Sequence, residues 1–237
     1  MFKNNDTDNI LTAPSQRILS DYVAERLRQA ILVGQFEPNQ RLVEQDIAES
    51  VKTSRGPIRD ALKILENEGL VTRQTHRGAF VAELNPDDMH EIFSLRKALE
   101  SLAIQYLIEK ATEEQIDELE KIVQSMEVMS LKDYGQAEAT DLDMDFHHTL
   151  CKISGHKRVL TAWEALSGQI RIVLWKHRLV HPTDLRDRSV PWHAGIVEAL
   201  RERNKEKAVD LLNVHLAASM EWVDQLVKQK KVVKEEK

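Results

Sequence analysis

Apolar side chains recur at helical spacing along most of the 237-residue chain. This period of about 3.6 residues is typical of amphipathic helices, and β-favouring runs interrupt it only at 70–74 and 79–82, on either side of a turn at "THRG". The chain is therefore predicted to be mainly α-helical, with one hairpin. The predicted helices span 17–33, 43–51, 54–69, 87–110, 112–130, 134–153, 157–180, 190–202 and 205–230.

The order of these elements predicts two domains. Two short helices joined by a tight turn suggest a helix-turn-helix, and the hairpin that follows would be its wing. The stretch "GQFEPNQRL" before them is predicted to be a turn-rich connector, and "NPDD" at 85–88 is a natural boundary because Asn-Pro breaks regular structure. We expect a flexible arm over 1–15, a winged helix-turn-helix over 16–84, an all-helical bundle over 85–230 and a charged tail over 231–237.

Composition favours a cytoplasmic protein. A single cysteine, Cys151, excludes an internal disulfide framework, and no apolar run approaches the roughly 18–20 residues of a membrane helix. The polar N-terminus lacks the features of a signal peptide. The net charge of −6 argues at first against nucleic acid, but residues 52–77 carry six Lys and Arg against three Asp and Glu.

Those basic residues lie on one face of the helix predicted at 54–69. Arg55, Arg59 and Lys63 recur every four residues, about 100° from the apolar stripe, so they are expected to be exposed. Arginine on a helix in the major groove can bind guanine bidentately, and the wing could contact the backbone or the minor groove. A solvated helix face is the alternative, but the helix-turn-helix, the local charge and the basic wing together favour double-stranded DNA.

The segment "RLVEQDIAESVKTSRGPIRDALKILENEGLVTRQTHRGAFV" resembles the winged helix-turn-helix of the GntR family of bacterial transcription regulators, and the match spans residues 17–82. The resemblance implies DNA contacts at Arg55, Gly56, Pro57 and Arg59, with His76, Arg77 and Gly78 in the wing. Gly56 replaces the usual Thr, and Gln45 stands where some members have Arg. These two departures bear on base preference.

The stretch "DLDMDFHH" contains a pair suited to metal binding. Asp143 and His147 are four residues apart, so on a helix they lie about 40° apart on one face. His193 and His215 are equidistant from a turn predicted at Asn204, which would put both at one height, roughly 16 Å along two antiparallel helices at ~1.5 Å per residue.

Spacing alone leaves this four-ligand site open, because most histidines on helices are surface or satisfied core residues. Asp145 and His148 point away from the face of the first pair and are expected to face solvent. Cys151 extends that face and could be a ligand, although a lone buried cysteine is more often part of the packing.

The region 85–230 resembles the metal-binding form of the FCD effector domain found in the FadR-like branch of the same family. "DMDFH" matches its Asp-x-x-Phe-His motif, and its later histidines correspond to His193 and His215. The resemblance therefore implies a metal held by Asp143, His147 and these two histidines. Three histidines and one carboxylate suit zinc, nickel, manganese or iron, and the sequence does not choose among them.

Two arginines are candidates for binding an acidic effector. Arg96 lies at the edge of an apolar helix stripe and points a cation towards the interior, with pairing to Glu100 as the alternative. Arg171, at the edge of the apolar face of its helix, is the weaker second candidate.

The favoured interpretation is a homodimeric, ligand-responsive transcription regulator, with repression as the expected mode. A small organic acid held by the metal would change its binding to an operator. The alternatives are a metal-dependent enzyme using the Asp/His site and a DNA-binding protein whose metal is purely structural.

Overall fold

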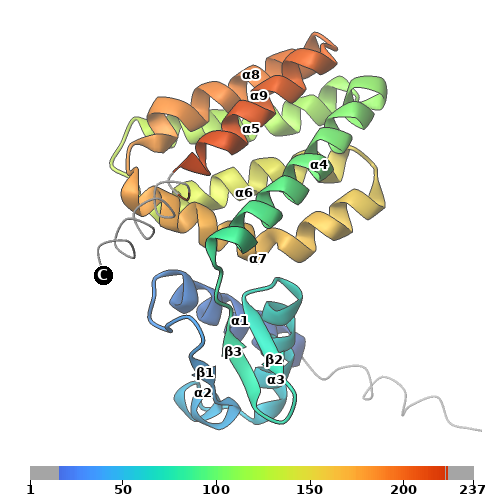
Figure 1. The fold of residues 1–237 in the computed structure, drawn as a ribbon. Helices are drawn as coiled ribbons and strands as arrows, with labels where there is room; N and C mark the ends of the chain where they lie inside the picture. Colours follow the sequence, from blue (N-terminus) through green and yellow to red (C-terminus); the bar gives the residue numbers. More distant parts are fainter. Residues whose placement is uncertain (1–15, 222, 224–237) are drawn as a thin grey trace, which may run out of the picture. The chain divides into compact units, whose positions relative to one another are not determined.

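The N-terminal part of the chain forms a small helical unit with a three-stranded sheet (Figure 1). The computed structural model describes residues 16–221 and residue 223, and the chain divides between Glu83 and Leu84 into two compact units. The arm predicted at 1–15 and the tail predicted at 231–237 lie outside the described residues. The elements of the first unit are α1 (Gln16–Leu32), β1 (Arg41–Leu42), α2 (Glu44–Ser50), α3 (Arg55–Asn67), β2 (Val71–Gln74) and β3 (Gly78–Val81).

Helix α3 anchors this unit because it buries the predicted apolar stripe. Ile58, Ala61, Leu62 and Leu65 are all fully buried, and α3 packs against α1 and α2. Ser54 occupies the N-cap position of α3, but its side chain makes no capping hydrogen bond.

The predicted hairpin is present, and it has a third strand that the sequence did not indicate. Strands β2 and β3 pair antiparallel, with Val71 opposite Val81 and Gln74 opposite Gly78. β1 adds to the other edge of β3, giving the order β1-β3-β2. The prediction of a connector without a strand was therefore wrong at Arg41–Leu42. A two-residue strand has too short a pattern to be recognised, and it exists only because β3 offers a free edge.

The C-terminal unit is an all-helical bundle (Figure 1). Helix α4 touches α6, α7, α8 and α9, and is thus the common neighbour of most of the bundle. Asn85 and Asp88 form a capping box at its start, which explains why the chain begins a new helix at the predicted boundary. The elements are α4 (Pro86–Lys110), α5 (Glu113–Ser130), α6 (Gln136–Ile153), α7 (Lys157–Val180), the π-helical turn η1 (Leu185–Ser189), α8 (Val190–Arg201) and α9 (Lys205–Ala218).

The predicted fold class, mainly α with a winged helix-turn-helix and a helical bundle, is confirmed. The π-helical turn η1 was not predicted; it runs directly into α8. Among the described residues, none of the helices combines the length and apolar character that crossing a membrane requires.

Candidate metal centre and nucleic-acid interface

Four side chains from three helices meet in the interior of the bundle. Asp143 and His147 come from α6, His193 from α8 and His215 from α9, and one ligand atom of each lies within 4.8 Å of the others. All four are buried, none with more than 2% of its surface exposed. The structure thus brings the four predicted ligands together. Asn204 is the N-cap of α9, so the turn also begins where the spacing argument requires.

The three imidazoles converge through their Nε2 atoms. His147 Nε2 lies 3.0 Å from His215 Nε2 and 3.2 Å from His193 Nε2. Two nitrogens that bind one ion at about 2.1 Å, at angles between 90° and 109°, are about 3.0–3.4 Å apart. The observed distances therefore suit three nitrogens on a single ion. The carboxylate of Asp143 lies 3.7–3.8 Å from the same nitrogens.

Neighbouring acceptors fix the protons of two of these rings. His147 Nδ1 lies 2.7 Å from Glu100 Oε2, and His193 Nδ1 lies 2.6 Å from the carbonyl oxygen of Ser189. We assign the proton of each ring to Nδ1, which donates to these acceptors. Both Nε2 atoms then carry lone pairs that face each other without a proton between them. Two facing lone pairs repel each other, but both would be attracted to a cation placed between them. The residues present therefore fit a divalent transition metal.

Burial keeps the imidazoles of His193 and His215 neutral, as metal ligands must be. Desolvation lowers the pKa of His193 to about 4, although the Asp143 carboxylate opposes it. Desolvation also holds the pKa of His215 well below its usual value, helped by the two neighbouring histidines. Burial alone would raise the pKa of Asp143, but the positive charges of Arg178 and Arg96 oppose this, and the pKa is lowered. The carboxylate is thus ionised, and the rings of His193 and His215 are not.

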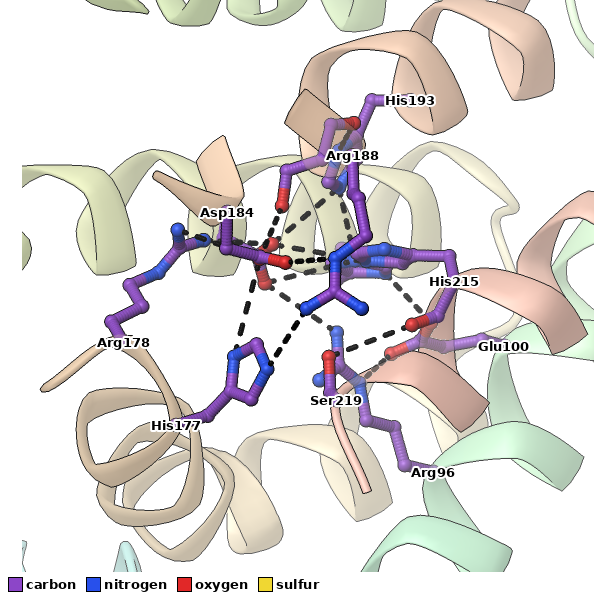
Figure 2. A network of polar contacts seen from close by, with 12 residues as sticks. Arg96, Glu100, His177, Arg178, Asp184, Arg188, His193, His215 and Ser219 are labelled. Carbon is purple, nitrogen blue, oxygen red and sulfur yellow. Dashed lines mark hydrogen bonds and ion pairs between the residues drawn. The ribbon is translucent and has the colours of Figure 1, made fainter. Parts of the chain in front are cut away.

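Glu100 supports the centre from α4 (Figure 2). Besides the His147 proton it accepts hydrogen bonds from Arg96 Nε and Trp163 Nε1, both at 2.7 Å. Burial would raise the pKa of Glu100, but the positive charge of Arg96 and the hydrogen bonds from His147 and Arg96 lower it to about 2. A carboxylate that orients a metal-binding histidine is a common second layer around metal ions.

Arg96 makes the pairing with Glu100 that the sequence offered as the alternative to effector binding. Its Nε pairs with Glu100, while Nη1 and Nη2 are buried without a hydrogen-bond partner. Nη2 lies 3.8 Å from Asp143 Oδ2. Arg178 on α7 approaches the other oxygen of Asp143 at 3.3 Å, and its Nε and Nη1 also lack hydrogen-bond partners.

The remaining candidates lie outside this group. Arg171 forms an ion pair with Asp141. Asp145 is exposed, as expected, and His148 is partly exposed and lies 3.2 Å from Glu164. Cys151 is fully buried, and burial raises the pKa of its thiol, so it belongs to the packing.

The sequence does not indicate three groups that contact the candidate ligands: Arg178, the Ser189 carbonyl, and Glu100 as a partner of His147. The sequence pattern indicates Glu100 only as a partner of Arg96. Arg178 follows Arg171 by two helical turns, so the spacing that suggested the first arginine could also have found the second. The Ser189 carbonyl has no signal in the sequence, because a backbone oxygen becomes available only through the irregular turn η1.

The predicted DNA-reading residues lie on an exposed surface of the N-terminal unit. Arg55, Arg59 and Lys63 are exposed on α3, Gly56 is partly buried, and Pro57 is buried in the first turn. Pro57 therefore shapes the helix start more than it offers a side chain. Both arginines are held by α2: Arg55 donates to Gln45, and Arg59 Nη2 lies 3.2 Å from Glu44 Oε2.

The predicted wing residues are exposed as well. His76, Arg77 and Gly78 are exposed at the β2–β3 turn. His76 and Gly78 have positive φ angles of 62° and 100°, the region in which glycine costs least. The Arg77 guanidinium lies over the Phe80 ring, 5.6 Å from its centre, so the tip carries a positioned cation.

A winged helix-turn-helix with an exposed basic helix, followed by a helical bundle with a buried polar centre, defines the class of two-domain transcription regulators. Comparison with known families agrees: residues 19–81 match the gntR family of bacterial regulatory proteins, and residues 91–218, more than half of the chain, match the FCD domain. The chain belongs to the gntR family of bacterial regulatory proteins and carries an FCD domain.

Two proteins with similar sequences are named as transcription regulators. The chain is 29% identical over 224 residues to the uncharacterized HTH-type transcriptional regulator YdhC of Bacillus subtilis (strain 168), covering 93% of this chain and 97% of the relative. It is 29% identical over 196 residues to the gluconate operon transcriptional repressor of the same organism, covering 81% of this chain and 79% of the relative.

Two solved structures share the fold. The first is a GntR transcriptional regulator from Rhodococcus sp. RHA1, with a TM-score of 0.67 at 23% identity over 86% of this chain and 96% of that one. The second is E. coli McbR/YncC, with a TM-score of 0.69 at 19% identity over 88% of this chain and 98% of that one.

Proposed function

We propose that this regulator is a metal-dependent repressor whose operator binding responds to a small carboxylate. Its divalent metal is held by Asp143, His147, His193 and His215. The observation that carries the proposal is the distance of 3.2 Å between Nε2 of His147 and Nε2 of His193, on two rings whose Nδ1 atoms each lie beside an oxygen acceptor. Zinc, nickel, manganese and iron all accept this donor set, and an ion that prefers five or six ligands keeps positions for a carboxylate.

Arg96 is the proposed anchor for the effector. Its Nη1 and Nη2 are buried beside Asp143 and have no hydrogen-bond partner, so an incoming carboxylate would satisfy them. Arg171 stays a weaker prediction, because binding an effector would require it to exchange Asp141 for the new acid. The gluconate operon repressor, a relative, is named for an operon of a sugar acid, which is consistent with an acidic effector.

The proposed DNA interface is α3 with the wing. Arg55 and Arg59 read bases in the major groove, Gly56 and Pro57 allow the helix start to approach closely, and Lys63 binds phosphate. His76, Arg77 and Gly78 contact the backbone or the minor groove. Two copies of the chain would bind two half-sites of a near-palindromic operator. For the effector to control this binding, it must prefer one arrangement of the regulator over another.

A purely structural metal is the competing function, because four buried ligands from three helices also tie the bundle together. The variant His215→Ala separates the two. Metal content, circular dichroism and operator release by a panel of small carboxylates are measured on the full-length variant and wild type. Normal folding with lost metal and lost response supports the sensor. Loss of folding supports the structural metal, and a wild type that binds no divalent metal overturns the proposal.

A further inference from the structure

Two buried guanidinium groups beside the candidate metal centre have unused donors. Nη1 and Nη2 of Arg96 and Nε and Nη1 of Arg178 are inaccessible to solvent and have no hydrogen-bond partner. The two residues come from different helices, α4 and α7, and are 0% and 1% exposed. Charged donors are rarely left unpaired in a protein interior, because water can no longer satisfy them. Their presence therefore points to an acceptor that binds between them.

The carboxylates nearby are already occupied. Asp143 meets both arginines, with Oδ1 3.3 Å from Arg178 Nη2 and Oδ2 3.8 Å from Arg96 Nη2, but it is also a candidate metal ligand. Glu100 accepts three other hydrogen bonds. Asp184 accepts from two other side chains and lies 4.0 Å from Arg178 Nη1. In Figure 2 both guanidinium groups point towards the same central region from two sides.

The buried charges balance only while no metal ion is present. Arg96 and Arg178 contribute two positive charges, and Glu100 and Asp143 contribute two negative charges. The neighbouring pair of Asp184 and Arg188 is neutral as a whole. Imidazoles that bind a metal are neutral, so a divalent ion would leave two uncompensated positive charges in the interior. Such charge is strongly disfavoured unless a counter-ion accompanies it.

We propose that the ligand of this site is a short dicarboxylate. Arg96 would hold one carboxylate beside the candidate metal ligands, and Arg178 would hold the second. A dianion supplies two negative charges and an acceptor for each guanidinium group. A monocarboxylate leaves one positive charge uncompensated and one guanidinium group without an acceptor. A short chain is expected because both arginines approach the two oxygens of one carboxylate, that of Asp143. The inference rests on the proposed function, since it names the chemical class of the effector.

Matched acids test the second charge. Succinate and its monoamide, succinamate, have the same length and differ by one negative charge; malonate and glutarate with their monoamides extend the comparison to other lengths. Binding to the full-length, metal-loaded protein is measured by isothermal titration calorimetry. We expect the best dicarboxylate to bind roughly ten- to hundredfold more tightly than its monoamide, as one additional charge-assisted contact implies.

Variants of Arg178 locate that second charge. In Arg178→Gln we expect the preference for the dicarboxylate to fall to within about threefold, with monoamide binding little changed, while Arg178→Lys retains part of the preference because it keeps the charge. The exposed Arg158 on the same helix provides the control: Arg158→Gln should retain the full preference. Metal content and circular dichroism are measured for every variant. If Arg178→Gln does not fold, Arg178→Lys and the wild-type comparison still decide.

The possible outcomes separate the two proposals. Equal affinity of each dicarboxylate and its monoamide in the wild type overturns the dianion and leaves a carboxylate sensor standing. A preference that survives unchanged in Arg178→Gln overturns the assignment of the second carboxylate to this arginine. Binding of none of these acids by the metal-loaded protein overturns both the dicarboxylate and the proposed effector function.

Discussion

Substituting Glu100 by glutamine is the sharpest test of the metal centre, because it changes one charge and almost no volume. The wild-type carboxylate accepts one hydrogen bond from His147 on Oε2 and two, from Arg96 and Trp163, on Oε1. Glutamine has an oxygen on only one side. If its amide group faces His147, the ring must accept at Nδ1 and protonate Nε2, which then cannot bind a metal. If the amide faces the other side, it meets two donors.

The magnitude follows from the environment of Glu100. Its pKa of about 2 lies some 2.5 units below its usual value, and each unit corresponds to about 1.4 kcal/mol, so the folded state favours the ionised form by about 3 kcal/mol. Because the folded pKa is lowered, this stabilisation is present above about pH 4.5 and is lost as the pH falls towards 2. At pH 7 we expect Glu100→Gln to lower the free energy of unfolding by a similar amount and to weaken metal binding 10- to 100-fold.

Competitive titration with a metal-sensitive chelator and urea unfolding measure these two effects. Glu164→Gln is the matched control, since Glu164 pairs with His148 from an exposed position, and it should change neither quantity appreciably. Metal affinity within twofold of the wild type in Glu100→Gln would refute the argument that Glu100 sets the tautomer of His147.

Three further changes test other parts of the molecule. Arg59→Ala should abolish specific operator binding in a fluorescence anisotropy titration while metal content stays intact; unchanged affinity would count against α3 as the reading helix. Gly78→Ala should weaken operator binding and destabilise the wing, because φ is +100° there, and a wild-type melting temperature would contradict this strain. Burial lowers the pKa of His177 to about 4 in the folded protein. As the pH falls below about 6.5, His177 is therefore protonated in the unfolded chain before it is protonated in the folded one, which favours unfolding. Between pH 7.5 and 5 the free energy of unfolding, measured with urea, should therefore fall by about 2 kcal/mol more in the wild type than in His177→Asn. Equal losses in the two proteins would show that His177 does not cause this pH dependence.

The sequence determined most of the fold because its patterns are local. The apolar period located most helices to within a few residues, although α9 ends at Ala218 and the prediction carried this helix to 230. The start of α4 followed from Asn85 and the residues after it. The sequence also identified Asp143 and His147 as a pair, since a spacing of four residues puts two side chains on one helix face. Equal distance from Asn204 aligned His193 with His215, because helical rise is nearly constant.

Tertiary structure decided what no local pattern encodes. The strand β1 exists because β3 offers it an edge, and the Ser189 carbonyl reaches His193 because the chain forms a π-helical turn just before α8. Glu100 and Arg178 become parts of the centre only when α4 and α7 bring them to α6. The sequence alone therefore specified the family, the helices and the four candidate ligands. Folding decided their protonation and charge balance, since burial and contacts between distant segments set both.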